Sequence, residues 1–124
     1  MNGYCAIVFC VVKGVYFQVK TPLGVTVRTT KKYWKVILTI KHPSISGFES
    51  EVKEALLDPD QIRKSKQDER VHLYYKSIGK LTVCVVADHV SNKEGYIITS
   101  YLTDRIKEGE QIYVKTKDIL RERN

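Results

Sequence analysis

Cysteine is scarce in this chain of 124 residues. The three cysteines, Cys5, Cys10 and Cys84, form no CxxC pair. An odd number of cysteines without paired spacing argues against a framework of disulfides. We therefore expect a reducing, cytoplasmic setting.

The sequence also lacks the motifs of metal and nucleotide sites. It has no HExxH, no clustered acids, no P-loop and no GxGxxG. Each of these spacings is needed to gather metal ligands or to cradle a phosphate. We therefore expect neither a metal nor a cofactor. Acid/base chemistry remains open, and imidazole is the side chain best suited to it near neutral pH.

Long apolar runs are limited to one segment, YCAIVFCVVKGVYFQV, at residues 4–19. Lys13 and Gly14 interrupt it, no A-x-A site follows it, and a bilayer span needs roughly 20 apolar residues. It predicts a β-hairpin that turns at Lys13-Gly14 within an N-terminal extension, residues 1–20. A membrane-proximal helix is the alternative, and we expect no membrane partner.

Acidic residues are outnumbered, with 14 Asp and Glu against 21 Lys and Arg, a formal net charge of +7. Such a charge attracts polyanions and favours nucleic acid as the partner, with an acidic protein as the alternative. Hydrophobic residues make up 43% and charged residues 28%, which is the composition of a globular protein. The length predicts a single domain over residues 1–124 with its core at 21–117.

Two helices are expected in the first half of the chain. Thr30 is a candidate N-cap for a helix that reaches Ile40 and ends at His42-Pro43, because a proline pushes the preceding residue out of helical geometry. Ser46 and Glu49 have the spacing of a capping box for a second helix that ends before Pro59.

Four strands are expected after the helices, because the pattern changes to period two. They are IRKSK, VHLYYKSI, LTVCVVADHV and GYIITSYLTD, joined by short connections. Short connections indicate an antiparallel meander. The predicted fold class is α+β, with two N-terminal helices packed on a four-stranded antiparallel sheet and an extra N-terminal β-hairpin. The tail, residues 118–124, is expected to be a frayed helix or disordered.

Helices on one face of the sheet leave the other face open. Period two directs Tyr96, Ile98 and Leu102 toward the helices and leaves Thr99, Tyr101 and Thr103 on the open face. The same alternation groups Arg63 with Ser65. It also groups three residues of the next strand on the open face, opposite Val71, Leu73 and Tyr75; they are His72, Tyr74 and Lys76. These side chains predict a surface that holds an anion.

Each candidate also has an ordinary structural interpretation. His42 could simply interact with the dipole at a helix end. His72 and His89 fit ordinary surface or edge positions, and Arg63 with Ser65 fits a solvated edge strand as well as a phosphate site.

The tyrosines and threonines of the strands are also open to two interpretations. Tyr74, Tyr75 and the row from Thr99 to Thr103 fit an RNA-stacking platform. They fit strand propensity equally well.

The ordered set of segments is more specific than any one of them. TIKHP before a capped helix, then LLDPDQIRKSKQD, VHLYYK and GYIITSYLTDRIKEGE, resembles the small phage and bacterial proteins grouped with the Barnase-EndoU-Colicin-RelE-like (BECR) nucleases. The resemblance covers about residues 25–112. It implies a helical part packed on a four-stranded antiparallel sheet whose open face cleaves RNA without metal.

The resemblance further implies catalytic roles for five residues: His42, Arg63, Ser65, Thr99 and Tyr101. His42 would be the general acid or base, and Arg63 would stabilise the phosphorane. Five more are expected to bind RNA: Lys64, His72, Tyr74, Lys76 and Thr103. The expected function is that of a ribonuclease toxin neutralised by a small antitoxin protein, acting through attack of the 2′-hydroxyl to leave a 2′,3′-cyclic phosphate. The alternatives are an RNA-binding or protein-binding module without catalysis.

Overall fold

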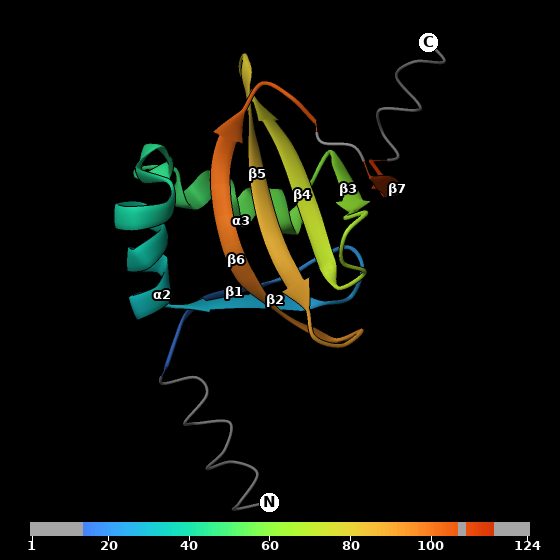
Figure 1. The fold of residues 1–124 in the computed structure, drawn as a ribbon, viewed down its shortest axis with the longest axis horizontal. Coiled ribbons are helices and arrows are strands. Elements are labelled where there is room, and N and C mark those ends of the chain that lie inside the picture. Colours follow the sequence, from blue (N-terminus) through green and yellow to red (C-terminus); the bar gives the residue numbers. More distant parts are fainter. Residues whose placement is uncertain (1–13, 107–108, 116–124) are drawn as a thin grey trace, which may run out of the picture.

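The structure, a computed structural model, describes residues 14–106 and 109–115 (Figure 1). In that part of the chain, seven strands form one mixed sheet in the order β1-β2-β6-β5-β4-β3-β7. The strands are β1 (Val15–Lys20), β2 (Thr26–Thr30), β3 (Gln61–Lys64), β4 (Val71–Ile78), β5 (Leu81–His89), β6 (Glu94–Thr103) and β7 (Glu110–Val114). The helical segments are α2 (Lys31–Val36), the π-helix η1 (Ile37–Lys41), the 3₁₀ helix η2 (Pro43–Ile45) and α3 (Glu49–Leu57).

The expected architecture of two helices on a four-stranded sheet is wrong. The four expected strands are present as β3 to β6 and pair antiparallel in sequence order. Three further strands extend this meander, because β2 adds to β6 in parallel, β1 pairs with β2, and β7 covers the free edge of β3. The chain therefore builds a seven-stranded sheet with short helices.

The N-terminal hairpin differs from the expected one. The strand expected before Lys13-Gly14 lies outside the described residues, as do Cys5, Cys10 and the tail at 118–124. The hairpin that the structure contains joins β1 to β2 through a turn at 21–24, where the N–H of Gly24 donates to the carbonyl of Thr21 at 2.9 Å. Gly24 has a φ of 82°, a left-handed conformation that glycine adopts at little cost.

The first helix begins where the sequence predicts. The hydroxyl of Thr30 accepts a hydrogen bond from the N–H of Tyr33 at 3.1 Å, and the helix continues as η1 up to His42. The predicted capping box of the second helix is wrong: the N-cap is Phe48, without a side-chain cap bond. The 3₁₀ turn at Pro43–Ile45 and Gly47 precede it, so Ser46 lies too early in the chain to cap α3.

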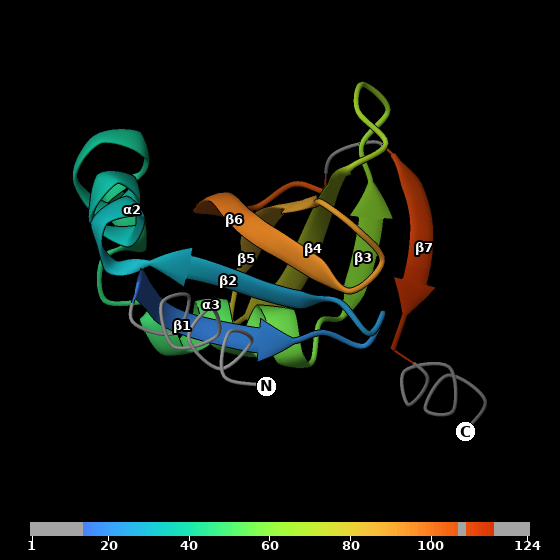
Figure 2. The same cartoon turned by 90° about the horizontal axis from the view of Figure 1, so that it is seen from below.

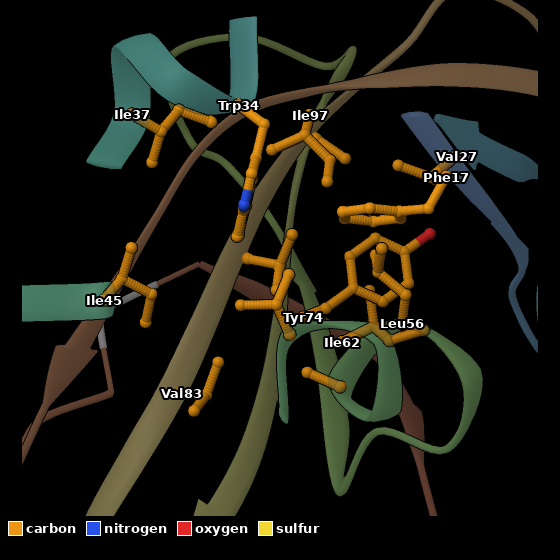
Figure 3. Packing of buried hydrophobic residues seen from close by; sticks show 14 of the residues in the cluster. Phe17, Val27, Trp34, Ile37, Ile45, Leu56, Ile62, Tyr74, Val83 and Ile97 are labelled. Atoms are coloured by element: carbon orange, nitrogen blue, oxygen red, sulfur yellow. The ribbon is translucent and has the colours of Figure 1, made fainter. Parts of the chain in front are cut away.

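The main hydrophobic core lies between α3 and one face of the sheet. Helix α3 contacts β4, β5 and β1, and Figures 1 and 2 show the sheet curving around it. Figure 3 shows side chains from α2, from α3 and from the strands meeting in one cluster. Its largest members include Phe17, Val27, Trp34, Ile37, Ile45, Leu56, Ile62, Tyr74, Val83 and Ile97.

The face of β3 to β6 opposite α3, called the second face below, also carries buried residues. Leu73, Tyr75, Cys84 and Val86 form a separate apolar cluster there, each at most 9% exposed. Tyr101 packs against its margin. The second face is therefore not an open polar surface, because its middle is a buried apolar cluster on β4 and β5.

Candidate functional site

A β-bulge in β6 decides which residues of this strand reach the second face. Thr99 pairs with Val86 and Ile97 pairs with Ala87, so Ile98 has no partner in β5. Ile97 is buried in the main core, whereas Ile98 packs against the cluster on the second face. The expectation that Ile98 faces the helices is wrong, because the extra residue reverses the alternation at this point.

Beyond the bulge, the expected faces of β6 are confirmed. Ser100 is fully buried and donates to the carbonyl of Cys84 at 2.9 Å, and Leu102 packs against the main core. Thr99 and Thr103 pair with Val86 and Thr82 across the sheet, which places them on the second face with Tyr101.

The free carbonyl at the bulge holds the helical segment to the sheet. The hydroxyl of Tyr33 donates to the carbonyl oxygen of Ile98 at 2.6 Å, and the ammonium of Lys41 donates to the same oxygen at 3.3 Å. Strand β2 pairs with β6 only at residues 94–96, so α2 and η1 cover the next part of this strand edge. The π-helix and the bulge thus position His42, the residue that follows η1.

His42 and Tyr101 meet on the second face. Their ring centroids lie 5.2 Å apart with the planes tilted by 39°. His42 is half-buried, and no group in residues 14–106 or 109–115 hydrogen-bonds to its ring nitrogens. Burial raises the pKa of Tyr101, so its hydroxyl stays protonated at neutral pH. The pair thus places an imidazole beside a phenol that keeps its proton and acts only through hydrogen bonds.

Thr99 provides a second polar group at this point of β6. Its hydroxyl oxygen is buried and has no hydrogen-bond partner within the described ranges. An unsatisfied buried hydroxyl costs about 1 to 3 kcal/mol, so a structure rarely keeps one without a role. A bound ligand that offers a hydrogen bond would remove this cost.

Arg63 lies on the same face but far from His42. It shares a cross-strand row with Leu73, Val86 and Thr99, so three inter-strand steps, about 14 Å, separate it from Thr99. Its guanidinium donates to Gln61 Oε1 at 2.7 Å, to the carbonyl of Gly109 at 3.0 Å and to Gln111 Oε1 at 3.3 Å. The last two partners lie on the β7 side, away from β6. The structure therefore does not bring Arg63 together with His42, Thr99 and Tyr101.

The partners of Arg63 leave its charge uncompensated. All three are neutral oxygens, and no described carboxylate forms a salt bridge with it. Arg70, by contrast, forms a two-bond ion pair with Asp88 at 2.9 and 2.7 Å. Arg63 is thus held in place while its positive charge remains available to an anion.

Ser65 lies in the loop after β3. Its hydroxyl accepts the N–H of Gln67 at 3.2 Å, a local turn interaction. Thr103 behaves in the same way at the end of β6, where its hydroxyl accepts the N–H of Arg105 at 3.0 Å. Both residues hold loops at the border of the second face.

Three residues expected to bind RNA lie on the α3 side instead. Tyr74 is fully buried in the main core, His72 is 8% exposed, and Lys76 donates to the carbonyl of Asp58 at 2.9 Å. The expectation that these three residues share one face of β4 is confirmed. The expected face is wrong, because Val71, Leu73 and Tyr75 are the residues of β4 on the second face. A ring without exposed surface cannot stack on a base, so Tyr74 is excluded from this role.

Lys64 forms an ion pair with a residue of the neighbouring strand β7. Its ammonium lies 3.5 Å from Glu110 Oε1 of β7. The register pairs Lys64 with His72, which places it on the α3 side of the sheet. It therefore belongs to an inner strand and forms a surface ion pair with β7, and it is not part of the second face.

His72 and His89 form a stacked pair on the α3 side. Their ring centroids lie 3.7 Å apart, and His89 Nε2 lies 2.7 Å from the hydroxyl of Tyr74. Burial lowers the pKa of His72, and burial together with the neighbouring His72 lowers that of His89 to about 4. Both are neutral at pH 7, which indicates a structural role, but they do not take the expected surface or edge positions, because β4 and β5 are inner strands and His72 is buried.

Lys41 is the functional candidate that sequence reasoning missed. Its ammonium bonds only to the neutral carbonyl of Ile98 and lies 5.4 Å from the ring centroid of Tyr33. No carboxylate of the described residues forms a salt bridge with it. Its place directly before His42 in TIKHP is the signal that could have pointed to it.

Two hollows of the surface lie beside this site rather than in it. One, of about 260 Å³, adjoins Tyr33 and Tyr96, and the other, of about 250 Å³, adjoins Tyr16 and Glu49. Neither contains His42 or Arg63. His42 and Tyr101 therefore meet outside both hollows, at the border of the buried cluster on the second face.

Comparison of the chain with protein-family models, with curated proteins and with solved structures found no match in any of the three. Among the residues that the structure describes, no group of three or more His, Cys, Asp and Glu side chains could hold a metal ion. No helix in that part of the chain is long and apolar enough to cross a membrane.

Proposed function

We propose that this protein is a metal-independent endoribonuclease whose reaction centre is formed by His42, Thr99 and Tyr101. The observation that carries the proposal is the contact of the His42 and Tyr101 rings at 5.2 Å, next to the unsatisfied hydroxyl of Thr99. The sequence resemblance to BECR nucleases implies catalytic roles for these three residues and also for Arg63 and Ser65. His42 and Tyr101 come from segments 59 residues apart in sequence, and their contact supports the proposal.

The reaction would use the ribose 2′-hydroxyl as nucleophile. The 2′-oxygen forms a bond to the adjacent phosphorus and gives its proton to the imidazole of His42. The bond from phosphorus to the 5′-oxygen breaks, this oxygen takes up a proton from the solvent to become a free hydroxyl, and His42 releases the proton that it took to the solvent. The products are a 2′,3′-cyclic phosphate and a 5′-hydroxyl end, so neither water nor a redox partner is consumed.

The neighbouring groups would stabilise the charge that develops on the phosphate. Tyr101 and Thr99 donate hydrogen bonds from their hydroxyls, and Lys41 supplies a positive charge beside them. A single preorganised donor of this kind is typically worth about 10²-fold in rate. Because burial raises the pKa of Tyr101, this hydroxyl keeps its proton and acts as a donor throughout the neutral range.

Arg63 takes a different role from the one that the resemblance implies. At about 14 Å of sheet from Thr99 it would bind another phosphate of the same strand. Between the two positions lies the buried cluster of Leu73, Tyr75 and Val86, and the strand would pass over the half-buried side chains packed against it. Ser65 and Thr103 border this path and keep their loops in place.

Cleavage of a single-stranded RNA by the full chain in excess EDTA tests the proposal. We expect RNA to be cut and DNA of the same sequence to stay intact, with 2′,3′-cyclic phosphate ends on the products. His42→Gln should lower the rate by about 10²- to 10⁴-fold, the usual contribution of a general acid or base.

The matched control is His89→Gln, because His89 lies on the opposite side of the sheet. This variant should cut RNA at the wild-type rate at pH 7.5. Cutting of DNA, a strict need for Mg²⁺, or equal rates for His42→Gln and wild type would refute the mechanism. Binding of RNA without cleavage would instead support a binding module.

We further propose that the protein acts in the cytoplasm as the toxin of a toxin-antitoxin pair. Its net charge of +7 suits both an RNA substrate and a small acidic antitoxin that would cover the second face. Expression in a bacterial host should arrest growth, and His42→Gln should relieve the arrest at equal soluble levels. Equal arrest by both chains would count against this role.

A further inference from the structure

The hollow that adjoins Tyr33 and Tyr96 lies where β2 separates from β6, next to the proposed reaction centre. It has a volume of about 260 Å³ and is lined by Thr29, Thr30, Tyr33, Tyr96 and Ile97. Its volume is slightly below the roughly 300 to 1,000 Å³ of sites for drug-sized ligands, which suits one planar ring. The hydroxyl of Tyr33 reaches the carbonyl of Ile98, so the hollow is only a few residues along β6 from Thr99.

Cations flank both tyrosine rings of this hollow. The guanidinium carbon of Arg28 lies 5.8 Å from the ring centroid of Tyr96, and Lys41 Nζ lies 5.4 Å from that of Tyr33. Nε of Arg28 is buried and has no hydrogen-bond partner within the described ranges, although its Nη1 bonds to Glu94 at 2.8 Å. Aromatic rings beside positive groups are the combination that binds single-stranded nucleic acid.

The second hollow, which has nearly the same volume, provides an internal comparison. Its lining includes Tyr16 and the carboxylate of Glu49, which accepts the hydroxyl of Tyr16 at 2.8 Å. The ammonium groups of Lys31 and Lys35 also line it, so neither volume nor charge distinguishes the two hollows. The hollow between β2 and β6 differs in its place, because its Tyr33 bonds to the carbonyl of Ile98, next to Thr99.

We propose that this hollow binds a nucleobase of the RNA strand, stacked on Tyr96, next to the nucleotide that is cleaved. The inference rests on the proposed function, because it places the substrate strand along β6. Tyr96 is 46% exposed, so its ring is accessible to a base. Lys41, which forms no salt bridge with a described carboxylate, then neutralises a phosphate beside that base, whereas the charge of Arg28 is compensated by Glu94. The protein thus recognises at least one nucleotide beyond the reaction centre.

The test uses an RNA oligonucleotide cut at one position and variants of it in which one nucleotide at a time lacks its base. With wild type, removal of one base near the cut should raise KM by about 10- to 100-fold with little change in kcat. Tyr96→Ala should show the same rise on the intact RNA and no further rise on the abasic one. Tyr96→Phe keeps the ring and should behave as wild type.

Tyr16→Ala is the matched control, because Tyr16 is 40% exposed and lines the other hollow. It should keep the wild-type KM. If Tyr96→Ala cuts every oligonucleotide with the wild-type KM, the base site is refuted while the ribonuclease stands.

Binding of a fluorescently labelled RNA, measured by anisotropy, separates the two proposals. If wild type binds RNA but never cuts it, the catalytic proposal is refuted. A 10- to 100-fold weaker affinity of Tyr96→Ala than of Tyr96→Phe then still supports the base site, and equal affinities refute it. If wild type neither binds nor cuts RNA, both proposals are refuted.

Discussion

The stacked pair of His72 and His89 predicts that the protein loses stability in mild acid. The pKa of His89 is lowered to about 4, first by burial and then by the neighbouring His72, against an ordinary value of 6.5. Below pH 6.5 the unfolded chain takes up a proton at this residue, whereas the folded protein does not until the pH approaches 4. The contribution is therefore fully present above pH 6.5 and is lost as the pH falls toward 4.

The size of the loss follows from the two pKa values. Between pH 7.5 and pH 5, His89 alone should lower the free energy of unfolding by roughly 2 kcal/mol. His72 adds a contribution of the same sign, because burial lowers its pKa as well. Asp58 has a lowered pKa because Lys115 and Lys76 bond to its carboxylate, so its stabilisation is lost only further into the acid range.

Urea denaturation at a series of pH values from 7.5 to 5 measures this effect. His89→Gln is the control, because the amide of glutamine can still hydrogen-bond with the Tyr74 hydroxyl, as donor or acceptor, but cannot take up a proton. We expect this variant to lose at least half of the pH dependence of the wild type. A wild-type free energy that stays constant over this range, or an unchanged slope in His89→Gln, would refute the reasoning.

Three further predictions concern the sheet and its second face. Tyr101→Phe should lower RNA cleavage by about 10²-fold with little change in melting temperature, and a wild-type rate would remove the hydroxyl from the mechanism. Arg63→Gln should reduce the slope of log affinity for RNA against log salt concentration by about one, as expected for one lost phosphate contact. Gly95→Ala should cost about 1 to 3 kcal/mol in urea denaturation, because an added Cβ would lie 2.8 Å from the backbone oxygen of Asp88; a stable variant would mean that β5 and β6 adjust freely.

The local elements of the fold were predictable from sequence. Thr30 caps α2 because its hydroxyl can reach the N–H of Tyr33, and Pro43 ends the helical segment after His42. The strands β3 to β6 follow from period two and short connections. The partners of β2 and β7 could not be predicted, because a parallel pairing and an edge pairing depend on contacts between distant segments rather than on local patterns.

The faces of the strands were only partly predictable. In β4, Val71, Leu73 and Tyr75 compete with His72, Tyr74 and Lys76 for the core, and both sets contain apolar rings. The structure buries Tyr74 against α3 and Tyr75 in the second cluster, so neither side is open. Composition could not decide between the two faces, because each side of β4 is covered and the polar residues of both sets find partners.

Three departures from regular structure meet at Ile98, beside the proposed reaction centre. The π-helix η1 brings Lys41 to its carbonyl, the bulge frees that carbonyl, and β2 parts from β6 two residues earlier. Each departure gives up regular hydrogen bonds, and such costs persist where they position functional groups. His72 and His89, by contrast, stack on each other and bond to their neighbours, as a structural pair should. The bulge in the middle of β6 is thus where the period-two pattern fails, and it lies beside Thr99 and Tyr101.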